Sequence, residues 1–471
     1  MKNNFTRRNF IKLSALSSAF LGLSGFTTPL SRETILEKIE DLSTAPIAKG
    51  KSVIGLTVPP IKQVKVAFIG LGNRGSEHLK LVNALTPDKA IITAICDVQK
   101  EKTDAALEEL KKSGHGQKPD VYTGTLDIWK EMIKRDDIDL VIIATHWEYH
   151  APMSLEAMRH KIHVAVEVPI AYTLDDLWAL VNTAEEMQVN CMMMENVCYG
   201  DEELWLLNMA QQGVLGTLTY AECAYIHNLR ELMFSKTYYY NMWRIRHHLV
   251  RDGNFYPTHG LGPVAQYMDI NRGDSFINMV SMSSLQAFLD EYSKEIESTN
   301  EFYNRTGYKH GDMVNTLIKT AKGRNILVQH DVVTPRPYNR INALAGTKGY
   351  HEGYPSRLSL VNIDKGHEWL NEKEYKKYWD KYQHPLWTKL KAGIEKYGGH
   401  GGMDFVMIYR IIDCLNNGWF LDQDVYDGAA WSVVAPLSTL SIELGSIPVK
   451  FPDYTRGKWS EQRELGILKN Y

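Results

Sequence analysis

The chain has 471 residues, which is too long for one compact core and predicts two domains plus tails. Apolar residues make up 44% and charged residues 23%, a composition typical of a soluble globular enzyme. The formal net charge of −3 argues against a nucleic-acid-binding protein. The five cysteines are odd in number and form no C-x-x-C pair, which argues against a disulfide framework and a zinc–cysteine site, so we expect no metal centre.

The N-terminus carries the features of an export signal. The pair Arg7-Arg8 precedes an apolar run over residues 13–26 that is too short and too rich in Ser and Gly to span a membrane. A twin-arginine pair in this frame predicts a Tat signal over residues 1–30. We therefore expect export to the periplasm without stable membrane insertion, and a linker over residues 31–60, where Pro, Gly and polar residues mix.

The next segment alternates strand, glycine turn, helix and strand. A short apolar strand over residues 64–69 runs into Gly70-Leu71-Gly72-Asn73-Arg74-Gly75, a G-x-G-x-x-G pattern. A helical stretch follows over residues 76–85, and a second strand over residues 90–96 ends at Asp97. This order is the context that a dinucleotide-binding βαβ unit requires, and it makes a glycine turn of another kind the weaker interpretation.

Each glycine of this motif, and the aspartate after the second strand, has a physical role in binding a dinucleotide. Gly70 permits the tight turn, Gly72 lets the backbone approach a pyrophosphate, and Gly75 lets helix and strand pack closely. Asp97 is placed to accept hydrogen bonds from the adenosine ribose hydroxyls. Because no Arg follows Asp97 closely, the sequence favours NAD over NADP.

Further strands and helices alternate up to residue 199. Strands are predicted over residues 139–144, 163–166 and 190–194, and helices over residues 155–160 and 174–187. This alternation predicts a doubly wound parallel sheet, a Rossmann domain over residues 61–199, with ligands beyond the carboxyl ends of its strands. The residues at those ends are Asp97, Trp147, His150, Glu167 and Asn196. Each alone could be a turn or cap residue, but their shared rim favours cofactor contact.

After Gly200 the pattern changes to strands that are not separated by regular helices. Strands are predicted over residues 217–226, 277–285, 315–320, 326–333 and 357–361, and helices over residues 263–269, 404–416 and 429–444. The fold class is therefore α/β plus α+β, with a second domain over residues 200–452 built on a largely antiparallel sheet, and a tail over residues 453–471.

Polar and aromatic residues cluster in this second half. His259 lies at a helix start among Tyr, Thr and glycines, where it is either a cap or an acid–base group. His247 and His248 are adjacent on a predicted helix and so do not face one metal site. The run from His400 to Asp404 either lines the pocket or only begins a helix.

Three features resemble the Gfo/Idh/MocA oxidoreductase superfamily: the glycine motif with Asp97, Thr145-x-x-x-x-His150, and Glu167-x-Pro169. Most members carry a lysine between the Glu and the Pro, where it serves proton transfer during sugar oxidation. This chain has Val168 there, which argues against an ordinary sugar dehydrogenase.

A narrower set of motifs is similar to glycoside hydrolase family 109, from about Val64 to about Pro452. The motifs are Gly72-Asn73-Arg74-Gly75, Trp147-Glu148-Tyr149-His150, Glu167-Val168-Pro169, Glu195-Asn196-Val197-Cys198-Tyr199-Gly200, Tyr225-Ile226-His227, Tyr256-Pro257-Thr258-His259-Gly260 and Asp269-Ile270-Asn271-Arg272-Gly273-Asp274. The resemblance implies an α-N-acetylgalactosaminidase that uses NAD without net redox change, and therefore a glycan substrate. The implied NAD contacts are Gly70, Gly72, Asn73, Arg74, Asp97, Trp147, Glu148, Tyr149, His150, Glu167, Val168, Asn196 and Tyr256. The implied sugar contacts are Tyr225, Arg244, Tyr256, Pro257, Thr258, His259 and Tyr338.

NAD-dependent glycosidases oxidise the sugar at C3, eliminate the leaving group, add water and reduce the sugar again. In such a scheme His259 fits the acid–base role, and Tyr256 and Tyr225 fit proton transfer or orientation. The sequence leaves open which group serves the C2 proton and which the 3-hydroxyl. The alternatives are a net sugar or inositol dehydrogenase, a non-catalytic NAD-binding protein, and a conventional glycosidase with Glu148 and Glu195 as its carboxylates. The sequence leaves the oligomeric state open, although members of the superfamily that it resembles often form homo-oligomers through the open face of the sheet.

Overall fold

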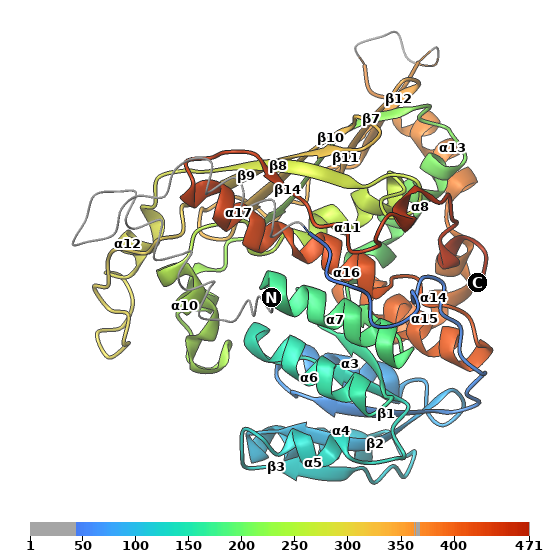
Figure 1. The fold of residues 1–471 in the computed structure, drawn as a ribbon, viewed down its shortest axis with the longest axis vertical. Coiled ribbons are helices and arrows are strands. Elements are labelled where there is room, and N and C mark those ends of the chain that lie inside the picture. Colours follow the sequence, from blue (N-terminus) through green and yellow to red (C-terminus); the bar gives the residue numbers. More distant parts are fainter. Residues whose placement is uncertain (1–43, 362, 364–367, 471) are drawn as a thin grey trace.

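A computed structural model describes residues 44–361, 363 and 368–470 (Figure 1). The predicted export signal over residues 1–30 lies outside the described residues and stays a prediction. None of the helices in the described part of the chain has the length and apolarity that a bilayer crossing requires.

The first domain is built on a six-stranded parallel sheet in the order β3-β2-β1-β4-β5-β6. Its strands are β1 (Val64–Ile69), β2 (Ala90–Asp97), β3 (Asp120–Thr123), β4 (Leu140–Ile143), β5 (His163–Val166) and β6 (Cys191–Met193). The predicted Rossmann sheet is confirmed. Strand β3 was not predicted, because it lies at the sheet edge, is half-exposed and lacks an apolar run.

Helices connect these strands on both faces of the sheet, as the reversal of strand order between β1 and β4 requires. They are α3 (Asn73–Asn83), α4 (Lys100–Lys112), α5 (Trp129–Ile133), α6 (Trp147–Arg159) and α7 (Leu174–Met187). Helix α6 begins eight residues before the predicted start at residue 155. The difference arises because Pro152 lies inside α6. A proline in a sequence argues against a helix at its position, but α6 continues through Pro152.

The second domain is built on an eight-stranded sheet in the order β13-β12-β11-β7-β10-β9-β8-β14. Its strands are β7 (Leu218–Ile226), β8 (Phe276–Ser283), β9 (Val314–Thr320), β10 (Asn325–Asp331), β11 (Ala343–Gly346), β12 (Gly349–Glu352), β13 (Arg357–Leu360) and β14 (Val449–Lys450). Only β7 and β10 pair in parallel, which confirms the largely antiparallel sheet. The short strands β11, β12 and β14 were not predicted.

The remaining helices lie between this sheet and the first domain and at the two ends of the sheet (Figure 1). In chain order, with η for a 3-10 helix, they are η1 (Asn196–Tyr199), α8 (Asp201–Gln211), α9 (Arg230–Met233), η2 (Tyr240–Met242), α10 (Trp243–Val250), α11 (Thr258–Tyr267), α12 (Phe288–Tyr292), α13 (Glu372–Tyr382), α14 (Pro385–Tyr397), η3 (His400–Gly402), α15 (Met403–Asn417), α16 (Val425–Ser432), α17 (Val434–Glu443), η4 (Lys458–Ser460) and η5 (Gly466–Leu468). The helical stretch predicted over residues 429–444 is helical in the structure, but it is divided between α16 and α17. Two helices meet at Val433, and Pro436 in the first turn of α17 cannot continue the hydrogen-bond ladder of α16.

Helix α11 packs directly on β7, and glycines make this close approach possible. A Cβ at Gly260 would lie 2.6 Å from the backbone nitrogen of Ala224, and one at Gly262 would lie 3.0 Å from Cγ of Glu195. The helix therefore lies between the central strand of one sheet and the end of the other. This packing brings His259, in the first turn of α11, to the junction of the domains.

Residues 453–470 return to the Rossmann domain. Arg456 forms an ion pair of 2.7 Å with Glu185 at the end of α7 and donates to the Asn182 side chain at 2.6 Å. Leu465 and Ile467 are buried in the main hydrophobic core.

Candidate active site

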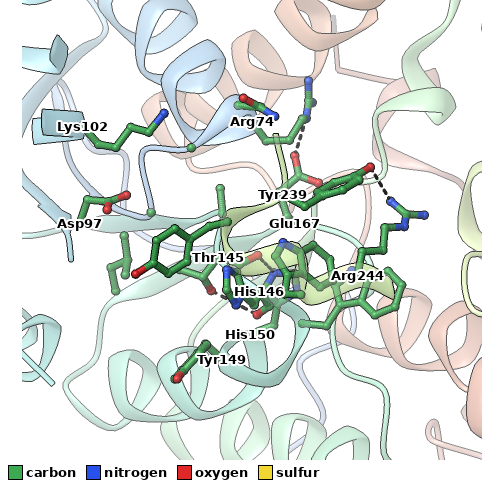
Figure 2. Close-up of a pocket in the computed structure, with 18 of the residues that line it drawn as sticks. Arg74, Asp97, Lys102, Thr145, His146, Tyr149, His150, Glu167, Tyr239 and Arg244 are labelled. Carbon is green, nitrogen blue, oxygen red and sulfur yellow. Dashed lines mark hydrogen bonds and ion pairs between the residues drawn. The ribbon is translucent and has the colours of Figure 1, made fainter. Parts of the chain in front are cut away.

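A single cleft of about 740 Å³ runs from the carboxyl ends of the Rossmann strands into the second domain. The predicted residues that line it are Gly70, Gly72, Asn73, Arg74, Asp97, Trp147, Tyr149, His150, Glu167, Val168, Asn196, Tyr225, Arg244, Tyr256 and His259 (Figure 2). The predicted residues that are not part of its lining are Glu148, Pro257, Thr258 and Tyr338.

The glycine turn between β1 and α3 has the shape that a pyrophosphate needs. Gly70 has φ of +87°, and a Cβ at Gly75 would lie 1.8 Å from the carbonyl oxygen of Gly70. A Cβ at Gly72 would instead project into open space of the cleft. Among the described residues no side chain caps the N-terminus of α3, so its first amide groups are available to an anion. The turn therefore fits a dinucleotide.

Asp97 ends β2 beside this turn. Its Oδ2 accepts from the Leu71 amide at 2.7 Å and its Oδ1 from the Gln99 amide at 2.8 Å. Each oxygen keeps a lone pair, so the oriented carboxylate can still accept from a ribose diol. Lys102, from the next helix, lines the same end of the cleft and was not among the predicted site residues (Figure 2).

His150 joins the ends of two neighbouring strands. Its ring nitrogens lie 2.8 Å from the Pro169 carbonyl oxygen and 3.1 Å from that of Thr145, and its side chain is buried. The ring therefore holds the Glu167-Val168-Pro169 turn against the end of β4. Val168 brings an apolar side chain to the cleft at the position where the superfamily resemblance leads one to expect lysine.

An ionic network joins the glycine turn to the C-terminal helices. The Arg74 guanidinium pairs with Glu167 and with Asp404 of α15, each at 2.9 Å, and Asn196 donates to Asp404 at 2.7 Å. Burial disfavours ionisation of Glu167 and Asp404, but Arg74 and neighbouring histidines outweigh it and hold the pKa of both carboxyls well below their usual range. The alternative in which residues 400–404 line the site is thus favoured, since His400 also lines the cleft.

His259 of the second domain pairs with Glu195 at the end of the Rossmann domain. Nδ1 of His259 donates to Oε1 of Glu195 at 2.7 Å, and the Glu195 side chain is fully buried. The rings of Tyr225 and Tyr256 lie 5.3 and 4.8 Å from the His259 ring, centroid to centroid. Burial raises the pKa of both phenols far above that of a free tyrosine. A histidine backed by a carboxylate thus lines the cleft beside two tyrosine rings whose hydroxyl groups stay protonated, and the Tyr225 hydroxyl lies 3.1 Å from Nδ1 of His227.

Arg244 of α10 is a buried cation held by aromatic rings. Its guanidinium lies 4.8 Å from the Tyr256 ring centroid and 5.3 Å from that of Trp147, and Nη1 donates to the Tyr239 hydroxyl at 3.2 Å (Figure 2). Its Nε is buried without a hydrogen-bond partner in the described residues. Arg244 also lines the cleft, so its guanidinium brings a positive charge to this wall.

The predicted residues outside the lining have other partners. Glu148 lies 3.0 Å from His247 and Tyr338 accepts from Arg340 at 2.8 Å, while the Tyr338 ring packs at 5.1 Å against His227, a cleft residue. His247 and His248 point in different directions, as expected for adjacent residues of a helix. His247 contacts Glu148, and His248 packs against His310. Among the described residues no group of side chains has metal-binding geometry.

The Rossmann domain and its cleft place the chain in the class of dinucleotide-binding proteins with an oxidoreductase fold. The family described as "Oxidoreductase family, NAD-binding Rossmann fold" matches residues 64–195, and "Glycosyl hydrolase 109, C-terminal domain" matches residues 199–461. The chain belongs to glycoside hydrolase family 109.

Relatives of full length support this assignment. The chain is 46% identical to glycosyl hydrolase family 109 protein 1 of Shewanella sp. (strain ANA-3) and 45% identical to an alpha-N-acetylgalactosaminidase of Shewanella oneidensis, each over 99% of both chains. Solved structures share the fold: an NAD binding oxidoreductase from Klebsiella pneumoniae has a TM-score of 0.62 at 14% identity, and a levoglucosan dehydrogenase in complex with NADH has 0.61 at 16%. These similarities cover 83% of this chain and 99% and 100% of the respective structures.

Proposed function

We propose that the chain hydrolyses terminal α-N-acetylgalactosaminides with a bound NAD and without net redox change. The observation that carries the proposal is the cleft itself. It joins the glycine turn and Asp97, which fit a dinucleotide, to a carboxylate-backed histidine and a buried arginine, which fit a sugar. The name of the relative from Shewanella oneidensis supplies the substrate class.

When bound, NAD supplies a hydride acceptor for C3 of the sugar and returns the hydride at the end of the cycle. Oxidation at C3 makes the C2 proton acidic. His259 is the best-placed base for that proton, because Glu195 accepts its Nδ1–H and stabilises the imidazolium that forms.

The tyrosines serve as donors in this scheme. Because the raised pKa values of Tyr225 and Tyr256 keep both phenols protonated at neutral pH, they hold and orient hydroxyl groups of the sugar rather than act as resting bases. The guanidinium of Arg244, which lines the cleft, fits the acetamido oxygen or a hydroxyl. As the proton leaves C2, the C1–O bond breaks and the leaving oxygen takes a proton from solvent. The proton on His259 exchanges with solvent, water then adds its hydroxyl at C1, and His259 delivers a solvent-derived proton to C2.

The test is hydrolysis of a 4-nitrophenyl α-N-acetylgalactosaminide in deuterated water, with NADH absorbance recorded in parallel. We expect nitrophenol release, deuterium at C2 of the sugar and no accumulation of NADH. Released sugar without deuterium would reject the elimination route. NADH formed in proportion to product would instead favour the alternative of a net dehydrogenase.

A matched pair of variants separates catalysis from folding. We expect His259→Gln to lower both nitrophenol release and deuterium incorporation by about three orders of magnitude while NAD stays bound. His160→Gln removes a histidine at the surface end of α6 and should leave both unchanged. Equal activity of the two variants would exclude His259 as the base.

A further inference from the structure

The segment of residues 237–243, here called the aromatic strap, lies along the cleft between α9 and α10. It contributes Tyr238, Tyr239, Tyr240 and Trp243 to the cleft lining, although it belongs to the second domain. Nothing in the proposed chemistry uses these rings, and the sequence patterns did not single out the three tyrosines.

The strap is attached to both sides of the dinucleotide cleft. On the side of the glycine turn, Nδ2 of Asn73 donates to the Tyr238 carbonyl oxygen at 3.0 Å. On the side of β4, the His146 ring stacks on Trp243 at 5.2 Å and lies 5.9 Å from Tyr240. The strap therefore spans the cleft from the end of β1 to the end of β4.

The strap is also held in shape from within. Trp243 packs edge-on against Trp147 at 5.0 Å and against Tyr239 at 5.6 Å, and the Tyr239 hydroxyl accepts from Arg244 (Figure 2). Asn241 and Met242 both have φ near +50°, a left-handed conformation that side chains with a Cβ rarely adopt. Such strain persists only where surrounding contacts hold it, and it is concentrated at functional sites.

We propose that the aromatic strap retains the dinucleotide by closing over it, so that the cofactor exchanges slowly between catalytic cycles. The idea rests on the proposed function in one respect, that a dinucleotide occupies the cleft. A cofactor that is regenerated in every cycle has no need to leave, so a closed cleft does not slow turnover. A net dehydrogenase must release NADH each time, and a strap fixed at both sides would oppose that release.

Tyr240 is the residue on which to test the strap, because its side chain is 40% exposed and its removal does not disturb the core. Protein loaded with NADH is mixed with excess NAD, and the loss of nicotinamide fluorescence gives the dissociation rate. An aromatic pair contributes about 0.5–1.5 kcal/mol, so Tyr240→Ala should raise that rate about two- to thirteenfold. Tyr240→Phe keeps the ring and should behave as the parent protein does.

Tyr303 supplies the matched control, because it is 39% exposed in the same domain but lies outside the cleft lining. Tyr303→Ala should leave the dissociation rate unchanged.

The association rate of NADH distinguishes a strap that must open from a side chain that only contacts the bound cofactor. A strap that must open slows entry as well as exit, so NADH should also bind to emptied Tyr240→Ala protein faster than to emptied parent protein. Unchanged exit, or faster exit with unchanged entry, would overturn the proposal while leaving the glycosidase function intact. A parent protein that binds no NADH at all would overturn both.

Discussion

At the scale of single residues, the pair of His259 and Glu195 gives the sharpest prediction. Glu195→Gln keeps the size of the side chain but removes the negative charge that stabilises the imidazolium, so kcat should fall by about two orders of magnitude. The measurement is nitrophenol release at saturating substrate, with NAD content recorded to show that the cleft is intact. The double variant with His259→Gln should be no slower than His259→Gln alone, because the two residues act as a unit. Additive losses would contradict that coupling.

Asp97 and Lys102 give a second prediction, on cofactor choice. The Asp97 carboxylate accepts from a ribose diol but repels a 2′-phosphate, and Lys102 lies at the same end of the cleft. Asp97→Ser should therefore weaken NAD binding by about ten- to a hundredfold, since hydrogen bonds to charged groups contribute about 1.5–3 kcal/mol. The same change should strengthen NADP binding, as measured by titration of emptied protein.

Lys102 provides the control for that experiment. Adding Lys102→Ala to Asp97→Ser should remove the gain for NADP without further loss for NAD. A gain that survives the double variant would mean that another group receives the phosphate.

At the scale of elements, the sequence predicts those parts of the site that follow from a local rule. Asp97 and Glu167 were placed on one rim because parallel strands meet at their carboxyl ends, and the structure brings them to one cleft. The pairing of His259 with Glu195 follows no local rule. It depends on the close packing of α11 on β7 at Gly260, which only the folded domain determines. The attachment of Asp404 to Arg74, across more than three hundred residues, was beyond sequence reasoning for the same reason.

A group of three histidines lies where α10 meets β10, and it gives a prediction on how stability depends on pH. His248, His310 and His330 are buried, and their rings lie 4.3 and 5.1 Å apart in that order. Burial, mutual repulsion and the nearby Arg244 keep the pKa of His248 and His330 well below the usual value, although Asp252 opposes this at His310. The folded state therefore binds these protons less readily than the unfolded chain does.

The sign of the effect follows from linkage. Unfolded histidines have a pKa of about 6.5, so the stability from the neutral cluster is complete above that pH and is lost as the pH falls below it, by at most about 1.4 kcal/mol per pH unit for each group. His330→Phe should reduce the slope of unfolding free energy against pH between about pH 6 and 5, as measured by urea denaturation. His160→Asn, at the surface, should not. Equal slopes would show that the cluster does not titrate on unfolding.

At the scale of the whole molecule, the cleft exists only when distant parts of the chain have assembled. Its walls come from the Rossmann turn, from the aromatic strap and from η3 near the C-terminus, and α15 closes the network behind Arg74. Such a site cannot be filled before the chain has folded. A chain that crosses a membrane unfolded would have to find its dinucleotide on the far side.

The twin arginines at Arg7 and Arg8 would resolve that difficulty, because the Tat route carries folded proteins. We propose that the chain is exported by this route with its dinucleotide already bound, and we predict that protein recovered from the periplasm contains about one NAD per chain. Replacing both arginines by lysine should leave loaded, active protein in the cytoplasm, as measured by fractionation and by nucleotide content after acid release. A periplasmic protein without NAD, or export unaffected by the substitutions, would show that loading and export are not linked in this order.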